Sequence, residues 1–393
     1  MHRRLRFRPA FLGFALPAIL GACGDAVPPP APGDPLPGLE AGALEAFQAG
    51  RALFDRDFTE VEGLGPLFNQ RRCSSCHDVP TLGGSGVEAV RKATRWEDDR
   101  CDLLRAQGGD NLQARATAAL SAHGILREDR PAEATAAVDL AAPALYGLGL
   151  VDRIPEAALL AGEDPEDANG DGIRGRAARD AAGRVLRFGR KGDAPDLRGF
   201  IAGALIEEMG LTTAEHPAER GPNGAALPDG VDPAPDPEVP DASLDLLVAY
   251  VSGLAPVAPE RLETRAAADT VRAGEAVFEA IGCASCHRPE LQTGPDPDPV
   301  WDERPVRLYS DLLLHDLGPE RAGICGADAG PSEVRTAPLM GLRLRPSLLH
   351  DASTQRLEGA LTVHGGEAAN ARARFLTLDP ERRSALLRFL STL

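Results

Sequence analysis

The chain has 393 residues, of which 26% are charged and 43% hydrophobic, and its formal net charge is −17. This balance is typical of a globular protein, which excludes wholesale disorder, and the negative charge argues against nucleic acid or an anionic bilayer as the main partner. A membrane-spanning helix needs about 18 consecutive apolar residues, and no apolar run in the sequence is that long. Only 4% of the residues are aromatic, so a large buried ligand could supply part of the missing core area.

The first 22 residues have the pattern of an export signal. A basic stretch at 3–8 is followed by the short apolar segment 10–20, and Leu20-Gly21-Ala22 stands directly before Cys23. This resembles the bacterial lipoprotein box. We therefore expect Cys23 to be lipidated and to anchor a periplasmic protein to a membrane through Pro-rich residues 23–39, an extended tether. A plain secretory signal, cut nearby, is the alternative.

Two short motifs share the pattern Cys-x-x-Cys-His. They are Cys73-Ser-Ser-Cys76-His77 and Cys283-Ala-Ser-Cys286-His287. This spacing is typical of c-type haem attachment, because two thiols three residues apart can bond both vinyl groups of one haem while the adjacent histidine ligates the iron. We therefore predict two covalently bound haems, held by Cys73, Cys76 and His77 and by Cys283, Cys286 and His287.

Zinc and thiol redox chemistry are the rival interpretations of these motifs. Zinc ligand pairs usually lie within about 20 residues of each other, and the two motifs are much farther apart. A thioredoxin-like pair needs a βαβ context, which neither motif has. Cys101 and Cys325 remain, and the sequence leaves open whether they form a disulfide or stay as two buried thiols.

The chain contains an internal repeat. AGRALF (49–54) precedes the first motif and AGEAVF (273–278) the second, and APALYGL (142–148) is echoed by APLMGL (337–342). This predicts two related halves: an N-terminal haem domain at 40–255 and a C-terminal cytochrome c domain at 262–393.

Most of the elements that the sequence predicts are helices. Pro-, Gly- and Asp-rich residues 216–241 leave no room for a long helix, and strand patterns are sparse. We therefore expect an all-α fold of two cytochrome c-like domains with long loops and few strands. The expected helices are 112–122, 197–209, 242–253 and 380–393.

Several strings together resemble one known family. They are GLGPLFNQRRCSSCH (63–77), APALYGLGLVDRIP (142–155), DANGDGIRGR (167–176), FGRKG (188–192), EEMGLTT (207–213), IGCASCHRPEL (281–291), YSDLLLHDLGP (309–319), RTAPLMGL (335–342) and TVHGGEA (362–368). The chain resembles the bacterial di-haem oxidoreductases that are described as peroxidases and often labelled thiol oxidoreductases, which are related to the di-haem cytochrome c peroxidases. The resemblance runs from about residue 40 to 393. Apart from Cys101 and Cys325, no cysteine supports the thiol label.

The resemblance implies the remaining iron ligands. Five histidines are candidates for the position opposite the proximal ligand: His123, His216, His315, His350 and His364. In the peroxidase relatives a Met stands fourteen residues after the His of a His-Asp-Gly motif; here His350-Asp351-Ala352 replaces that motif and His364 stands at the Met position. We expect His364 to ligate the C-terminal iron, which lowers its reduction potential. For the N-terminal iron the nearest equivalent is His123, and a five-coordinate iron or Tyr146 is the alternative.

The resemblance also implies a peroxidase mechanism. A Glu in a matching string of the relatives transfers the proton that peroxide cleavage needs, and Glu208 occupies its place; a solvated carboxylate is the alternative. A small redox protein, possibly basic, would donate electrons through the C-terminal haem to a catalytic N-terminal haem, with a peroxide-type oxidant as substrate. A non-catalytic di-haem electron-transfer cytochrome is the alternative function. Relatives also carry Ca²⁺, and the turn at 167–172 (DANGDG) resembles the start of a calcium loop, although tight Asn-Gly and Asp-Gly turns form without metal.

Overall fold

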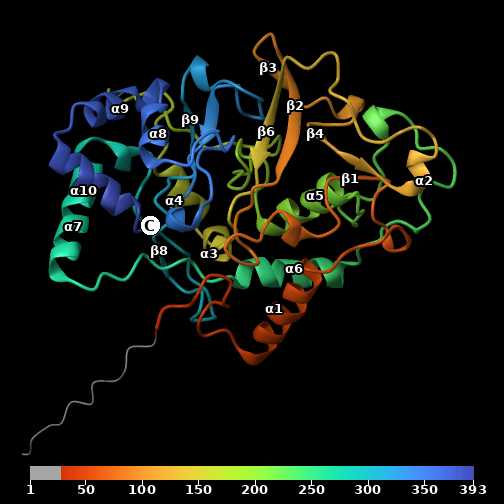
Figure 1. The fold of residues 1–393 in the computed structure, drawn as a ribbon, viewed down its shortest axis with the longest axis horizontal. Helices are drawn as coiled ribbons and strands as arrows, with labels where there is room; N and C mark the ends of the chain where they lie inside the picture. Colours follow the sequence, from red (N-terminus) through yellow and green to blue (C-terminus); the bar gives the residue numbers. More distant parts are fainter. Residues whose placement is uncertain (1–27) are drawn as a thin grey trace, which may run out of the picture.

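The computed structural model describes residues 28–393, so the predicted export signal and Cys23 lie outside the described residues. Figure 1 shows the C-terminal helices gathered at the left side of the molecule and α1 and α6 along its lower edge. The longest strands lie in the upper part of the same view. Within this range none of the helices combines the length and the apolar character that crossing a bilayer requires.

The N-terminal half is built around two crossed helices. α1 (Ala41–Phe54) leads toward the first haem motif and packs against α6 (Asp241–Gly253). The two backbones meet at Gly50, where a Cβ atom would lie 1.9 Å from the carbonyl oxygen of Leu246, so only glycine fits. This half also contains α3 (Leu148–Asp152), α4 (Glu156–Leu160), α5 (Leu197–Met209) and the short α2 (Ala118–Ser121).

The C-terminal half repeats this arrangement. α7 (Arg265–Ala280) leads toward the second motif and packs against α10 (Pro380–Leu390). Gly274 occupies the place of Gly50, since a Cβ atom there would lie 2.0 Å from the carbonyl oxygen of Ala385. α8 (Leu357–Thr362) and α9 (Ala369–Leu376) complete this half. The repeat read in the sequence is therefore a repeat of helix packing.

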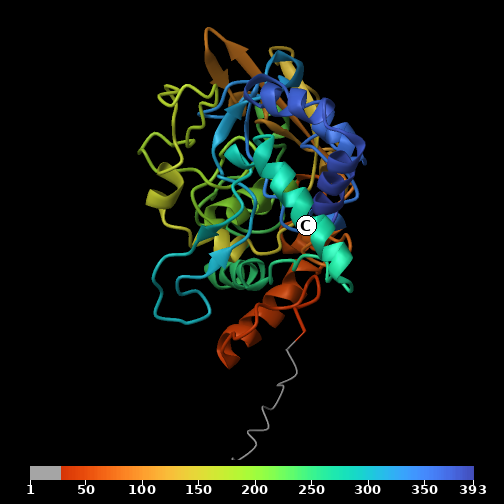
Figure 2. The same ribbon diagram turned by 90° about the vertical axis from the view of Figure 1, so that its left-hand side faces the viewer.

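The expectation of an all-α fold needs correction, because the structure is mostly helical but contains a four-stranded antiparallel sheet. β2 (Ala89–Glu97) pairs with β6 (Ala136–Ala141), and β3 (Arg100–Asp102) and β4 (Asn111–Leu112) also pair with β2. The helix expected at 112–122 is reduced to α2 (Ala118–Ser121), since its first residues belong to β4 and β5 (Arg115–Ala116). Figure 2 shows the sheet at the opposite end from α1.

Short two-stranded ladders make up the other strands. β1 (Leu67–Phe68) pairs with β5, β7 (Leu291–Gln292) with β8 (Pro305–Val306), and β9 (Leu314–Asp316) with β10 (Glu333–Arg335). Between residues 216 and 241 the structure has one 3-10 turn, Pro222–Gly224, as the Pro-rich composition predicts.

The two halves are interlocked. Residues 291–313, which the sequence assigns to the C-terminal domain, contribute Trp301, Leu308 and other buried side chains to the core of the N-terminal half. The Arg153 guanidinium lies 3.7 Å from the centre of the Trp301 ring. Cys101 in β3 forms a disulfide with Cys325, which answers the question that the sequence left open.

The described part of the predicted tether, residues 28–39, includes residues that pack against the folded domain. Leu36 is buried, and its N–H donates to the carbonyl of Gly253 at the end of α6, with N and O 2.7 Å apart. Pro35 forms an isolated β-bridge with Leu254. Residues 35–36 therefore belong to the folded domain and not to a free spacer.

Candidate functional site

The first Cys-x-x-Cys-His motif holds its histidine in the tautomer of a metal ligand. Cys73–Ser75 form a 3-10 turn, and His77 Nδ1 lies 2.9 Å from the carbonyl oxygen of Pro143 and 3.2 Å from that of Gly84. Carbonyl oxygens only accept hydrogen bonds, so Nδ1 carries the proton and Nε2 keeps a free lone pair. Burial lowers the pKa of His77, which keeps the ring neutral.

The second motif repeats this geometry. Cys283–Ser285 form a 3-10 turn, and His287 Nδ1 donates to the carbonyl oxygen of Tyr309 at 3.0 Å. An aromatic ring accompanies each proximal histidine: Phe54 lies 6.2 Å from His77 and Phe278 lies 6.5 Å from His287, measured between ring centres. Both histidines therefore present Nε2 as a ligand atom.

The four motif cysteines are free of disulfides. Burial raises the pKa of Cys73, Cys76 and Cys283 to about 12, and thiol exchange needs a thiolate. Protonated thiols beside a neutral imidazole instead fit the residues that bond and ligate a haem. On this donor set, each motif fits a covalently attached haem.

His364 faces the second motif. It follows α8, and its Nδ1 donates to the carbonyl oxygen of Ala360 at 2.7 Å, which again leaves Nε2 free. Burial and, after it, the neighbouring His364 lower the pKa of His287 to about 4, so the two rings lie close enough to interact. This geometry suits an iron ligated by His287 and His364, and that ligation stays a prediction.

Among residues 28–393, the groups that shift the pKa of His77 include no second histidine. His123 is exposed in the turn after α2, which argues against the prediction that it ligates an iron in a buried site. The Tyr146 hydroxyl donates to the carbonyl oxygen of Thr81 at 3.1 Å, and burial raises its pKa to about 12, so it keeps its proton. Of the sequence-based alternatives, a five-coordinate iron fits this geometry best.

Glu208 lies beside the first motif, near the end of α5. Burial is the main cause that raises the pKa of Cys76, and the charge of Glu208 is the next. The Glu208 carboxylate is therefore near the attachment site. Asn69 Nδ2 donates to Glu208 Oε2 at 2.8 Å, and Asn111 Nδ2 donates to Oε1 at 2.7 Å. Both oxygens are thus fixed by amides, while burial raises the pKa of Glu208.

Sequence reasoning missed both amides. Asn69 lies four residues before Cys73, so its position close to the motif could have marked it as a site residue. Asn111 reaches Glu208 only because β4 pairs with β2, and no local pattern announces that contact.

A partly buried group of charges includes Glu207, the neighbour of Glu208 in the chain. Lys92 Nζ is 3.1 Å from Asp110 Oδ2 and 3.7 Å from Glu207 Oε2. Burial raises the pKa of Glu207 to about 7, against the opposing effect of Lys92. The charge of Lys92 also acts on Glu208, where it opposes the effect of burial and lowers the pKa.

His315 is bonded to carboxylates at both ring nitrogens, so it cannot ligate an iron. Nε2 lies 2.9 Å from Asp311 Oδ2 and Nδ1 lies 2.8 Å from Glu367 Oε2. These bonds outweigh the effect of burial and raise the pKa of His315 to about 12, so the ring is an imidazolium. It joins the loop after Cys286 to the loop that carries His364.

The turn at 167–172 uses its own oxygens. Asp167 Oδ1, Asn169 Oδ1 and Asp171 Oδ1 each accept a backbone N–H, at 3.0, 2.8 and 2.9 Å. This favours the interpretation as a tight turn. A different group of carboxylates is close enough together to hold a metal ion, with ligand atoms within 4.8 Å of one another. Among residues 28–393 it consists of Glu219, Asp232, Asp236 and Glu238.

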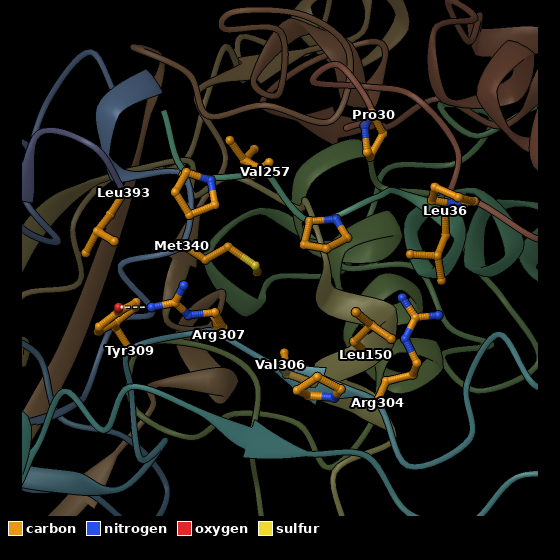
Figure 3. A pocket seen from close by; sticks show the side chains of 16 residues that line it. Pro30, Leu36, Leu150, Val257, Arg304, Val306, Arg307, Tyr309, Met340 and Leu393 are labelled. Atoms are coloured by element: carbon orange, nitrogen blue, oxygen red, sulfur yellow. Dashed lines mark hydrogen bonds between the residues drawn. The ribbon is translucent and has the colours of Figure 1, made fainter. Parts of the chain in front are cut away.

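An apolar cavity of about 270 Å³ lies between the halves. Figure 3 shows Leu36, Leu150 and Val257 around it, with Met340 and Tyr309 on the side of the C-terminal half. None of the motif cysteines or histidines lines it, although Tyr309, whose carbonyl oxygen holds His287, does.

Residues 137–393 match the family model described as "Di-haem oxidoreductase, putative peroxidase". The match covers more than half of the chain, so the protein belongs to this family, and membership implies an oxidoreductase with two haems. The matched range includes the second motif, Glu208 and His364, whereas the first motif lies before it. No curated protein matches the chain in sequence.

Three solved structures are similar over most of their length. A hydrazine synthase of Kuenenia stuttgartiensis is 13% identical and has a TM-score of 0.41; the alignment covers 98% of this chain and 100% of the hydrazine synthase chain. A MauG-like protein associated with microbial copper homeostasis is 17% identical, with coverages of 93% and 92% and a TM-score of 0.38. A variant of the diheme peroxidase BthA from Burkholderia thailandensis is 15% identical, with coverages of 88% and 85% and a TM-score of 0.40.

Proposed function

We propose that this di-haem oxidoreductase is an exported c-type peroxidase that reduces hydrogen peroxide at the His77 site. The observation that carries the proposal is the position of Glu208, whose carboxylate is held by two amides beside Cys76. A carboxyl group of raised pKa beside an iron with an open coordination position is what peroxide chemistry requires.

The chain's own residues handle the protons. Reduction of hydrogen peroxide takes up two electrons and two protons and releases two water molecules, and bound haem supplies the iron that binds peroxide and carries the electrons. Glu208 accepts the proton of the inner peroxide oxygen and returns it to the outer oxygen. Asn69 and Asn111 orient the carboxylate, and the charge of Lys92, which pairs with Asp110 and Glu207, favours the ionised form of Glu208.

The proposed electron donor is a small redox protein that docks on the C-terminal half. A net charge of −17 favours a basic donor, and such docking slows as salt screens the charges. A donor of this kind meets the enzyme in the periplasm, which agrees with the export pattern at 1–22.

Lipidation at Cys23 is tested by one substitution. We expect wild-type protein in the membrane fraction of bacterial cells, and Cys23→Ser protein either in the soluble periplasmic fraction or retained with its signal uncleaved. Mass spectrometry of the N-terminus tells these apart, and a wild-type chain without an acyl group contradicts the anchor.

Electron paramagnetic resonance of the oxidised protein tests the proposed function. We expect one high-spin signal, which cyanide converts to low spin, and one low-spin signal that cyanide leaves unchanged. Hydrogen peroxide should be consumed in the presence of a reduced basic donor, at a rate that falls as ionic strength rises.

Two low-spin signals that ignore cyanide, with no peroxide consumption, would instead establish a non-catalytic electron-transfer cytochrome. The geometry of His364 already suits a closed second iron, so the decision depends on the His77 site.

A further inference from the structure

Three arginines meet where the two halves join. Arg190 lies in the FGRKG turn of the N-terminal half, Arg335 ends β10, and Arg345 follows the 3-10 turn Leu342–Leu344. The Arg335 N–H donates to the carbonyl oxygen of Arg190 at 2.9 Å, and its side-chain Nε donates to that of Gly189. The two halves therefore place their guanidinium groups in one region.

None of the three forms an ion pair among the described residues. Arg190 donates to the carbonyl of Ala141, and Arg345 to those of Pro338 and Met340. The Nε atom of Arg345 is buried without any hydrogen-bond partner. These cations are thus bonded to neutral oxygens alone.

Burial lowers the pKa of all three arginines to about 10, which still leaves them charged at neutral pH. The charge of Asp193 raises the pKa of Arg190 and Arg335 and so opposes burial there. At Arg345 the neighbouring charge is that of Arg190, which lowers the pKa further. All three nevertheless keep part of their surface accessible. Among the described residues no carboxylate is a cause of the Arg345 pKa shift. A partly buried cation without an anion is costly, so this site calls for an anion from outside the described chain.

We propose that Arg190, Arg335 and Arg345 bind the propionate carboxylates of the two haems at the boundary between the halves. The planar guanidinium group matches a carboxylate with two parallel hydrogen bonds. Arg190 bonds to Ala141, two residues before the Pro143 carbonyl that holds His77. This places Arg190 on the side of the first haem.

Arg345 belongs to the side of the second haem. Its two carbonyl partners flank Leu339, which packs on the C-terminal core together with Phe278 and Tyr309. Arg335 connects the two sides through its bonds to the Arg190 segment. The inference depends on the presence of two haems and not on peroxide reduction, so it stands or fails separately from the proposed activity.

Redox titration of the holoprotein tests this assignment. A cation beside a haem disfavours the ferric state, so its removal lowers the reduction potential. We expect Arg345→Gln to lower the potential of the C-terminal haem and Arg190→Gln that of the N-terminal haem, each by about 59 mV for a tenfold change in the one-electron equilibrium constant. Low-spin resonance signals and haem content should stay as in the wild type.

Arg343→Gln is the matched control, because Arg343 is exposed two residues before Arg345 and should leave both potentials unchanged. Arg345→Lys keeps the cation and should retain most of the potential, which serves if the glutamine variant does not fold. Unchanged potentials in folded Arg345→Gln and Arg190→Gln overturn the proposal. So does a wild-type potential that follows added inorganic phosphate at constant ionic strength, since the arginines would then bind a dissolved anion.

Discussion

Glu208→Gln is expected to lower peroxide turnover by about two to four orders of magnitude, the usual contribution of a positioned acid–base group. Glutamine keeps the shape of the side chain and can still meet one of the two amides, but it cannot accept and return a proton. Stopped-flow measurement of peroxide consumption with excess reduced donor gives the rate. The control is Glu279→Gln, because Glu279 is an exposed glutamate near the second motif.

The pH profile separates a chemical role of Glu208 from a structural one. Burial raises the pKa of Glu208, and the carboxylate form is the one that accepts a proton. The wild-type rate should therefore fall as pH drops through a value above the ordinary glutamate range. In Glu208→Gln this limb should be missing, while cyanide binding and the resonance signals persist. Turnover at the wild-type rate in the variant excludes Glu208 as the acid–base group.

Removing the disulfide between Cys101 and Cys325 is expected to destabilise the fold by about 2–5 kcal/mol. The bond closes a loop with a sequence separation of 224 residues, and long loops restrict the unfolded chain most in the loop-entropy account. It also fixes β3 to the C-terminal half, where Cys325 is buried and its N–H donates to Thr94 Oγ1 at 3.0 Å.

Urea unfolding of a Cys101→Ser/Cys325→Ser double variant measures this effect. We expect a lower midpoint with unchanged haem spectra, because both cysteines are remote in sequence from the attachment motifs. Wild-type protein treated with dithiothreitol should unfold at the midpoint of the double variant. Equal midpoints for the oxidised wild type and the double variant contradict the expected stabilisation.

The sequence predicted the family and both attachment motifs, and it predicted several helices well. The helix expected at 197–209 is α5, and the one expected at 242–253 differs from α6 by a single residue. Both stretches carry a strong apolar pattern bounded by clear stops. By contrast, the helix expected at 112–122 was wrong, because Asn111 and Leu112 pair with a strand nearly twenty residues away in the chain.

The candidate site was only partly readable from the sequence. Local strings located Glu208 and His364, yet the amides that hold Glu208 come from residues 69 and 111, far from 208 in the chain. His315, a candidate ligand in the sequence, is occupied by Asp311 and Glu367 in the structure. Such contacts depend on the packing of distant segments, which no periodicity records.

The sequence by itself predicted where haem would be attached, because that chemistry needs two thiols and an imidazole within five consecutive residues. It also determined the internal repeat, since the glycines at 50 and 274 are required by equivalent helix crossings. Only the tertiary structure decided the sheet, the disulfide and the meeting of Arg190, Arg335 and Arg345. The physical reason is that each of these depends on segments brought together by folding, and the free energy that joins them comes from contacts between residues distant in the chain.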